Sequence, residues 1–166
     1  MNKILLINGP NLNLLGLRQV KLYGAQTLEE VVQNLKNSLP PSYTLAPFQN
    51  NIEGEIVNFL NFEFINSKEG KSKVKGIIIN PGAYTHTSIA IRDALEVFQE
   101  EGVKIFEVHL TNIFKRENFR HQSYISSIAD GVICGLGTFG YEMALKSIFN
   151  MDSRFRENDK CQQTLG

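Results

Sequence analysis

Ile4-Leu5-Leu6-Ile7, followed directly by Asn8-Gly9-Pro10-Asn11-Leu12-Asn13-Leu14-Leu15-Gly16-Leu17-Arg18, is the stretch that decides the fold of this chain. Four consecutive large apolar residues are typical of a strand buried on both faces of a parallel sheet. The loop that follows is rich in amides and continues to Tyr23 and Gly24. Because long loops in compact domains often carry function, this loop is a candidate for the mouth of an active site, with an ordinary surface loop as the alternative.

Outward from this stretch, strand-like and helix-like patterns alternate. Thr27 and Glu30 match a capping box that begins a helix, and Pro47 places its strand at a sheet edge because proline lacks a backbone donor. The predicted strands cover residues 4–7, 43–49, 76–80, 103–109 and 131–134, and the predicted helices cover residues 27–39, 51–62, 87–101 and 141–149. The alternation predicts an α/β fold with a five-stranded parallel sheet and helices on both faces.

The bulk composition limits the classes of partner. The chain has 166 residues, 42% of them apolar and 20% charged, which is enough for one domain with its own core. The formal net charge is zero, which argues against nucleic acid or an anionic membrane as the main partner, because both favour a basic surface. Residues 151–166 are polar and lack apolar periodicity, and we expect them to form a disordered tail.

Cysteine usage and hydropathy indicate the compartment. Cys134 and Cys161 belong to no disulfide framework and no metal-ligand spacing, which fits reducing surroundings. The N-terminal apolar run is too short for a signal peptide, and no later segment is apolar over the length of a membrane span. The expected location is the cytoplasm.

Three polar segments follow the carboxyl ends of predicted strands, at residues 8–24, 80–87 and 109–120. In an open parallel sheet, ligands bind beyond the carboxyl ends of the strands. We therefore expect these segments to meet at one rim and to form one site.

The second segment, Asn80-Pro81-Gly82-Ala83-Tyr84-Thr85-His86-Thr87-Ser88, leads from a strand into a helix. Ser88 or a threonine before it is the candidate N-cap, and backbone amides at a helix start suit an anionic ligand. His86 is either a ligand-binding side chain or a capping or surface residue. Arg92 and Asp93 lie further along the helix, where a solvated face is the alternative and the better interpretation for Arg92.

The third segment begins with Glu107-Val108-His109. Residues two apart on a strand share a face, so the Glu107 and His109 side chains are expected side by side. A carboxylate beside an imidazole orients the ring and favours its protonated form, which suits a general acid; a buried structural pair is the alternative. Downstream, Arg120 is a candidate anchor for a ligand hydroxyl or carboxylate, or else a partner in a surface salt bridge.

Arg18 and Tyr23 form a candidate pair in the first loop. A free tyrosine has a pKa of about 10, which is too high for a base at neutral pH. A nearby guanidinium favours the phenolate, so this pair, on a loop between Gly16 and Gly24, suits a base on a closable lid. A tyrosine packed on the surface is the alternative.

Gly135-Leu136-Gly137-Thr138-Phe139-Gly140 matches the G-x-G-x-x-G pattern. A dinucleotide site also needs a following strand with an acidic residue about 20 positions further on, and no further strand is predicted. We interpret this motif as close backbone packing. His86, His109 and His121 lack a tight metal-ligand spacing, so no metal is expected.

Taken together, residues 8–16 with Arg18 and Tyr23, and residues 80–88, 107–112 and 119–121, strongly resemble the type II 3-dehydroquinate dehydratases. The resemblance runs in order from residue 3 to about residue 149. It implies a flavodoxin-like fold with strand order 2-1-3-4-5 and a single catalytic domain over residues 1–150. It also implies dehydration of 3-dehydroquinate to 3-dehydroshikimate in the shikimate pathway of aromatic amino acid biosynthesis, without metal or cofactor, by a dodecamer of four trimers.

The resemblance also implies residue roles. Tyr23 is the implied base next to the ketone, Arg18 supports its phenolate, and Asn11 helps to hold a water that stabilises the enolate. His109, oriented by Glu107, is the implied acid. The implied substrate-binding residues are Asn80, His86, Asp93, Leu110, Thr111 and Arg120, with Asp93 reaching the site of a neighbouring subunit.

Two other interpretations stay open. The glycine motif at residues 135–140 fits a flavodoxin-like module that binds a nucleotide or phosphate. Gln19-Val20 follows Arg18 where the family usually has Glu-Pro, which fits an inactive, purely oligomeric relative with an altered lid.

Overall fold

Strands and helices alternate through the computed structural model, which describes residues 1–17 and 25–163. The described elements are β1 (Asn2–Asn8), α2 (Leu28–Asn37), β2 (Tyr43–Gln49), α3 (Glu53–Lys68), β3 (Lys73–Asn80), α4 (Ile89–Glu100), β4 (Lys104–His109), β5 (Gly131–Cys134) and α5 (Phe139–Gln163), with short 3-10 turns between them. The described strands form one parallel sheet in the order β2-β1-β3-β4-β5. The predicted α/β fold and its flavodoxin-like strand order are confirmed.

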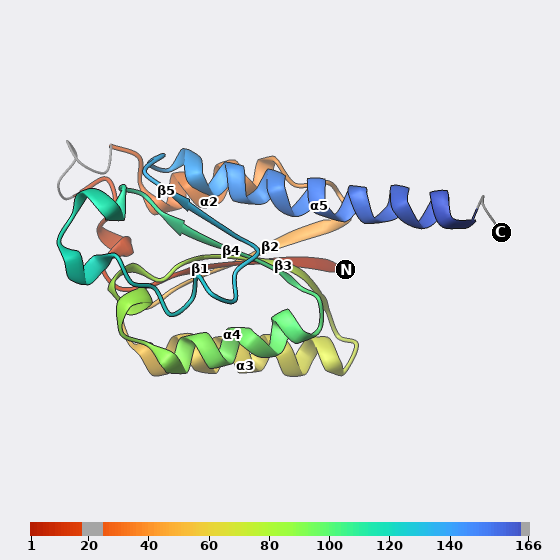
Figure 1. Cartoon of the computed structure of the whole chain (residues 1–166), viewed down its shortest axis with the longest axis horizontal. Coiled ribbons are helices and arrows are strands. Elements are labelled where there is room, and N and C mark those ends of the chain that lie inside the picture. Colours follow the sequence, from red (N-terminus) through yellow and green to blue (C-terminus); the bar gives the residue numbers. More distant parts are fainter. Residues whose placement is uncertain (18–24, 164–166) are drawn as a thin grey trace.

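The sheet lies between two helical layers, with α2 and α5 on one face and α3 and α4 on the other (Figure 1). β1 lies inside the sheet, between β2 and β3, and its apolar residues Ile4 to Ile7 are fully buried. Ile4 and Leu6 enter the core under α2 and α5, whereas Leu5 and Ile7 enter the core under α3 and α4. Each such side chain contributes about 1.5–3 kcal/mol on burial, so β1 anchors both cores.

The helix starts follow the caps that the sequence predicts. The Thr27 backbone N–H donates to Glu30 Oε2 over 2.7 Å, and the Glu30 backbone N–H donates to Thr27 Oγ1 over 3.2 Å, which completes the capping box of α2. Ser88 caps α4 by accepting the Ile91 N–H at 2.9 Å. The Ser88 cap places α4 directly after the second polar segment.

The predicted end of the second helix at residue 62 is wrong, because α3 continues to Lys68. The physical reason is that no glycine or proline interrupts residues 55–69. The helix ends just before Gly70, whose φ of +75° is a left-handed conformation that favours glycine. The long connector expected after Phe62 is therefore mostly helix, and β3 begins at Lys73 rather than at Gly76.

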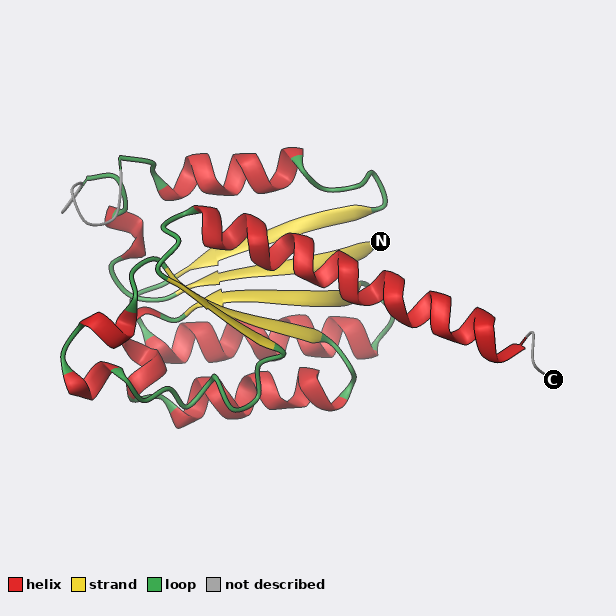
Figure 2. Cartoon of the chain, turned by 45° about the horizontal axis from the view of Figure 1, so that its top comes forward, coloured by secondary structure: helices red, strands yellow, loops and turns green. Residues whose placement is uncertain are grey.

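The predicted disordered tail is also wrong, since α5 runs from Phe139 to Gln163 rather than ending at Phe149. No glycine or proline breaks residues 141–165, and Arg, Glu, Lys and Gln are good helix formers. A lack of apolar periodicity argues against packing on the core, but it does not prevent a helix in solvent. Figure 2 shows this end of α5 projecting past the sheet, opposite the carboxyl ends of the strands.

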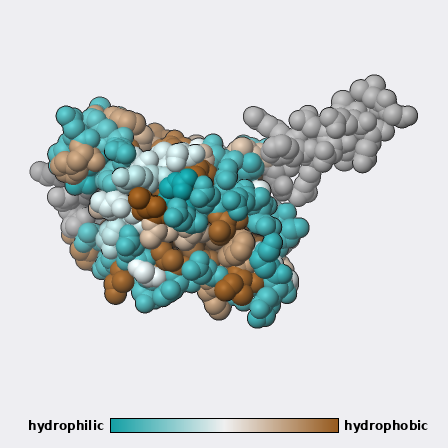
Figure 3. Space-filling view, turned by 60° about the horizontal axis from the view of Figure 1, so that its bottom comes forward, coloured by the Kyte–Doolittle hydropathy of each residue, from teal (hydrophilic) through white to brown (hydrophobic). Residues whose placement is uncertain are grey.

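Apolar side chains interrupt the hydrophilic surface on the side of the molecule that carries α3 and α4 (Figure 3). Phe62 and Ile65 of α3 are 61% and 55% exposed, and Ile89 at the start of α4 is 55% exposed. Within the described residues, none of the helices combines the length and apolar character that crossing a membrane requires.

Candidate active site

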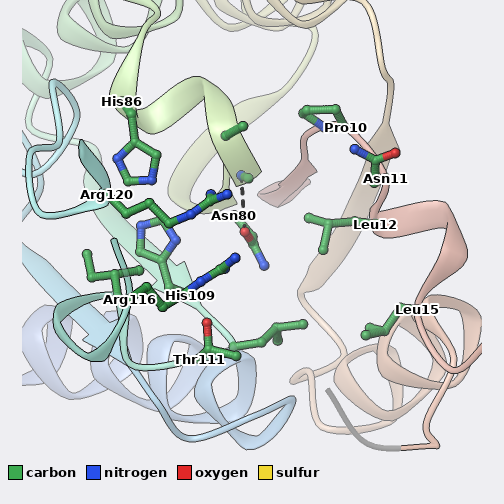
Figure 4. Close-up of a pocket in the computed structure, with 14 residues that line it drawn as sticks. Pro10, Asn11, Leu12, Leu15, Asn80, His86, His109, Thr111, Arg116 and Arg120 are labelled. Carbon is green, nitrogen blue, oxygen red and sulfur yellow. Dashed lines mark hydrogen bonds between the residues drawn. The ribbon is translucent and has the colours of Figure 1, made fainter. Parts of the chain in front are cut away.

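β1, β3 and β4 end at the same rim, and the segments after them enclose a pocket of ≈ 180 Å³. Its described lining is Pro10, Asn11, Leu12, Leu15, Asn80, Gly82, Ala83, His86, His109, Leu110, Thr111, Ile113, Arg116 and Arg120. Figure 4 shows the imidazole and guanidinium groups on one wall, facing the first loop across the cavity. The three segments that the sequence predicts to converge do meet at one pocket.

Most of the predicted site residues lie at this pocket, namely Asn11, Asn80, His86, His109, Leu110, Thr111 and Arg120 in the lining and Glu107 behind His109. Asp93 lies outside the lining, on α4. Its side chain is 60% exposed, and its carboxylate pairs with the Arg92 guanidinium at 2.9 Å. Arg18 and Tyr23 lie outside the residues that the structure describes.

His109 and Glu107 are neighbours on β4, as their spacing predicts. His109 Nε2 lies 2.7 Å from Glu107 Oε1, with Glu107 fully buried and His109 6% exposed. Because an ionised carboxylate only accepts hydrogen bonds, Nε2 carries a proton, and this N–H donates a hydrogen bond to Glu107. This bond leaves Nδ1 as the ring nitrogen that can meet a ligand.

Hydroxyl groups surround the Glu107 carboxylate. Ser123 Oγ lies 2.9 and 3.1 Å from its two oxygens, and the Thr85 and Ser126 hydroxyls also donate to it. Burial favours the neutral acid and would raise the pKa of Glu107. The hydrogen bond and the charge of His109 oppose it, together with the hydrogen bonds from Ser126 and Thr85, and the pKa of Glu107 lies below its ordinary value. Glu107 is therefore a fixed negative partner for the imidazole at neutral pH.

Sequence reasoning missed Ser123 and Ser126 and considered Thr85 only as a cap. The two serines follow Glu107 by 16 and 19 residues, and nothing in their local pattern points back to β4. The signal that could have found them is the burial of Glu107 itself, since a buried carboxylate requires donors from neighbouring segments.

His86 faces His109 across part of the pocket. Their rings are nearly parallel, at 11°, with centroids 6.4 Å apart. His86 Nδ1 lies 2.6 Å from the Gln122 carbonyl oxygen, which only accepts, so Nδ1 carries a proton. In the neutral ring, Nε2 is then an acceptor, which suits a ligand hydroxyl.

Arg116 and Arg120 give this wall its positive charge. Arg120 Nε donates to Glu117 Oε2 at 2.8 Å, and Arg116 Nε lies 3.7 Å from the same oxygen. Glu117 thus engages the Nε side of both guanidinium groups, while both arginines line the pocket. A guanidinium binds a planar carboxylate well, so the wall suits a carboxylate ligand. Sequence reasoning selected Arg120 but not Arg116, although both lie in the same basic run.

The first loop is held by the end of β2 and by the connection that follows it. The Asn11 backbone N–H donates to Asn51 Oδ1 at 2.9 Å, and Asn11 has a left-handed φ of +67°. Gln49 Nε2 donates to the Gly9 carbonyl at 3.2 Å and to Asn51 Oδ1 at 3.1 Å. Sequence reasoning missed Gln49 and Asn51, whose link to the loop depends on β2 lying beside β1.

Gly9 brings the first and second loops together, and its replacement by alanine is expected to destabilise the fold. A Cβ at Gly9 would lie 2.2 Å from the Pro81 carbonyl oxygen. Gly9→Ala should therefore lower the free energy of unfolding by about 1–3 kcal/mol, measured by urea denaturation. Gly54→Ala in α3 is the matched control, since a Cβ there meets nothing within 4 Å. Equal stability of both variants would contradict the close contact.

The glycine motif at residues 135–140 packs against the protein itself. A Cβ at Gly140 would lie 3.2 Å from Val108 and 3.4 Å from Ile133, and one at Gly135 would lie 3.2 Å from Asn112. These contacts support the packing interpretation, because the glycines let α5 begin close to β4 and β5. Among the described residues, no cluster of three His, Cys, Asp or Glu side chains could hold a metal ion.

Known proteins resemble this chain over most of its length. The model of the class II dehydroquinase family matches residues 2–149. The 3-dehydroquinate dehydratase of Buchnera aphidicola subsp. Cinara cedri is 51% identical over 145 residues, which are 87% of this chain and 90% of that protein. That of Actinobacillus pleuropneumoniae serotype 5b is 50% identical over 146 residues, 87% of this chain and 88% of that protein.

A solved structure gives the same result. The crystal structure of the type II dehydroquinase from Butyrivibrio crossotus superposes with a TM-score of 0.78 at 40% identity, covering 88% of this chain and 96% of that one. Sequence and fold agree with the resemblance that the motifs indicate, and the chain belongs to the class II dehydroquinase family.

Proposed function

We propose that this chain dehydrates 3-dehydroquinate to 3-dehydroshikimate, a step of the shikimate pathway, through an enolate intermediate. The observation that carries the proposal is the buried Glu107–His109 pair, which opens into a pocket that also contains Arg116 and Arg120. The pair supplies an acid and the guanidinium groups supply an anchor for a carboxylate. Relatives about half identical in sequence bear the name 3-dehydroquinate dehydratase.

The proposed reaction has two proton transfers. Tyr23, as a phenolate supported by Arg18, takes the proton from the carbon next to the ketone, and the electron pair of the C–H bond forms the enolate. Asn11 helps to hold a water that stabilises the enolate oxygen. The enolate then collapses, the carbon–oxygen bond of the leaving hydroxyl breaks, and His109 donates the proton with which that hydroxyl leaves as water.

The remaining lining residues are proposed to bind the substrate. Arg116 and Arg120 suit its carboxylate, and His86 accepts from a hydroxyl through Nε2. Asn80 donates through its amide, and the backbone at Leu110 and Thr111 contacts the substrate on the side of β4. This assignment adds Arg116 to the residues that the sequence indicates.

The test is to mix the protein with 3-dehydroquinate and record the absorbance of the conjugated product. We expect product formation that neither EDTA nor borohydride changes, because the proposed mechanism uses neither a metal nor an imine. A folded protein that forms no product would contradict the proposed function. Inhibition by EDTA or by borohydride would instead contradict a mechanism without metal or imine while leaving the reaction itself in place.

We propose that residues 1–150 form the single catalytic domain, and deletion of residues 152–166 is expected to leave kcat and KM unchanged. The family match ends at residue 149, and α5 projects away from the pocket beyond the sheet. The deletion keeps Met151, which packs against the core under α2 and α5. Steady-state kinetics of the truncated chain provide the measurement, and a large loss of kcat would contradict this domain boundary.

Assembly and location follow from the resemblance and stay predictions. We propose a trimer, and a dodecamer of four trimers, in which the exposed Asp93 of one subunit reaches the pocket of another. The exposed apolar side chains of Phe62, Ile65 and Ile89 fit burial between subunits. The cytoplasm is the proposed location.

A further inference from the structure

A buried tyrosine connects two of the strand ends that carry the pocket. The Tyr141 hydroxyl, in the first turn of α5, donates to Asn8 Oδ1 at 2.6 Å and accepts from Asn80 Nδ2 at 2.9 Å. Tyr141 is fully buried, and Asn8 and Asn80 are 1% and 3% exposed. Asn8 and Asn80 pair in register at the carboxyl ends of β1 and β3, so the hydroxyl bridges two adjacent strands.

The directions of these hydrogen bonds fix the Asn80 amide. A tyrosine hydroxyl has one proton, which goes to Asn8 Oδ1, so the hydroxyl accepts from Asn80. On the other side of the amide, Asn80 Oδ1 accepts the Gly82 N–H at 3.2 Å (Figure 4). A flipped amide would set its NH₂ group against the Gly82 N–H, donor against donor. Because the NH₂ group has two donors and Tyr141 uses one, the other is left for the pocket that Asn80 lines.

We propose that Tyr141 is a positioning residue, which holds the Asn80 amide so that its remaining N–H binds a substrate oxygen. This inference rests on the proposed role of Asn80 in substrate binding. Burial, opposed in part by the hydrogen bond from Asn80, raises the pKa of the Tyr141 hydroxyl far above its ordinary value. The hydroxyl therefore keeps its proton and remains a donor to Asn8 at any pH at which the enzyme works.

Tyr141→Phe isolates the contribution of the hydroxyl. The ring belongs to the core under α2 and α5, and phenylalanine keeps that packing. Without the hydroxyl, Asn80 keeps the Gly82 contact but loses the bond that fixes its NH₂ group. If the Asn80 N–H binds the substrate equally in the ground state and in the transition state, its misplacement raises KM and leaves kcat unchanged.

The experiment is a double-mutant cycle of Tyr141→Phe and Asn80→Ala, with kcat and KM measured on 3-dehydroquinate. We expect Tyr141→Phe alone to raise KM by about 3- to 10-fold, the effect of losing one hydrogen bond between neutral groups. In the Asn80→Ala background, Tyr141→Phe should cause no further change in KM, because the amide through which Tyr141 acts on the substrate is already absent. Ile148→Val is the control for stability, since Ile148 is buried in the same helix and packs on Gly76 rather than on Asn80.

The outcomes distinguish this inference from the proposed function. A lower kcat with unchanged KM for Tyr141→Phe, as for a variant that is merely less stable, would overturn the positioning role. An equal rise in KM with and without Asn80 would overturn it as well. If Asn80→Ala leaves KM unchanged, the role of Asn80 and the inference built on it both fail. The proposed function still stands in that case, provided that the chain without substitutions forms product. If the unchanged chain forms no product, the proposed function itself fails.

Discussion

Replacing Tyr23 with phenylalanine is expected to lower kcat for dehydration by about 10²–10⁴-fold, which is the contribution of a well-placed general base. A proton next to a ketone is weakly acidic, so its removal needs a strong base and a stabilised enolate. A phenolate is such a base, and a neighbouring guanidinium makes it accessible near neutral pH. Phenylalanine keeps the ring and removes the oxygen that receives the proton.

The measurement is kcat from initial rates, with circular dichroism to show that the variant is folded. Tyr124→Phe is the matched control, because Tyr124 is a described residue outside the pocket lining. It should retain the kcat of the unchanged chain. Near-normal turnover by Tyr23→Phe would remove Tyr23 as the base while leaving the dehydration itself in place. The result also tests the alternative that this chain is an inactive relative. A large loss of kcat can be measured only if the chain without substitutions is active.

Local patterns were enough to predict most of the fold. Each of the signals that predicted an element lies within a few neighbouring residues. They are the apolar run at Ile4 to Ile7, the capping box at Thr27 and the proline in the edge strand. The pairing of Glu107 with His109 has the same origin, because side chains two apart on a strand must share a face. The meeting of three loops follows from the rule that the carboxyl ends of parallel strands share one edge.

The missed features depend on contacts between distant parts of the chain. Tyr141 bonds to Asn8, which lies 133 residues earlier, and no local pattern encodes that contact. Ser126 donates to Glu107 from a loop that the sequence leaves unassigned. The extension of α5 was missed for a different reason, since polar helix formers and the absence of breakers matter even where a helix has no apolar stripe.

The two carboxylates next to the pocket residues differ in burial. Glu107 lies behind His109, fully buried and surrounded by hydroxyl donors, whereas Glu117 is exposed and contacts the Nε side of Arg120. The buried carboxylate contacts the imidazole and does not line the pocket. Arg116 and Arg120 line the pocket, so an anionic ligand would meet positive charge there, while the His109 imidazole has Glu107 as its own partner. In the proposed mechanism, this separation lets one small site bind an anion and protonate a hydroxyl.

His109→Ala is expected to reduce kcat by about 10²–10⁴-fold, because hydroxide is a poor leaving group unless an acid protonates it. His121→Ala is the matched control, since His121 is exposed and its Nε2 contacts the Arg116 backbone carbonyl at 3.2 Å. If His109→Ala turned over as fast as His121→Ala, the acid would have to be another group.

Glu107→Gln distinguishes an active partner from a buried structural pair. The amide nearly matches the carboxylate in shape but carries no charge to pair with the His109 ring, so kcat for dehydration should fall. Because the pKa of Glu107 is lowered in the folded state, its ionised form adds stability above the ordinary carboxyl range and loses it as the pH falls through the folded pKa. The glutamine variant should lack that acid-sensitive part of its stability. An unchanged kcat together with this flatter acid response would assign Glu107 to folding alone. A loss of kcat in the folded variant would instead support its role as the partner of His109.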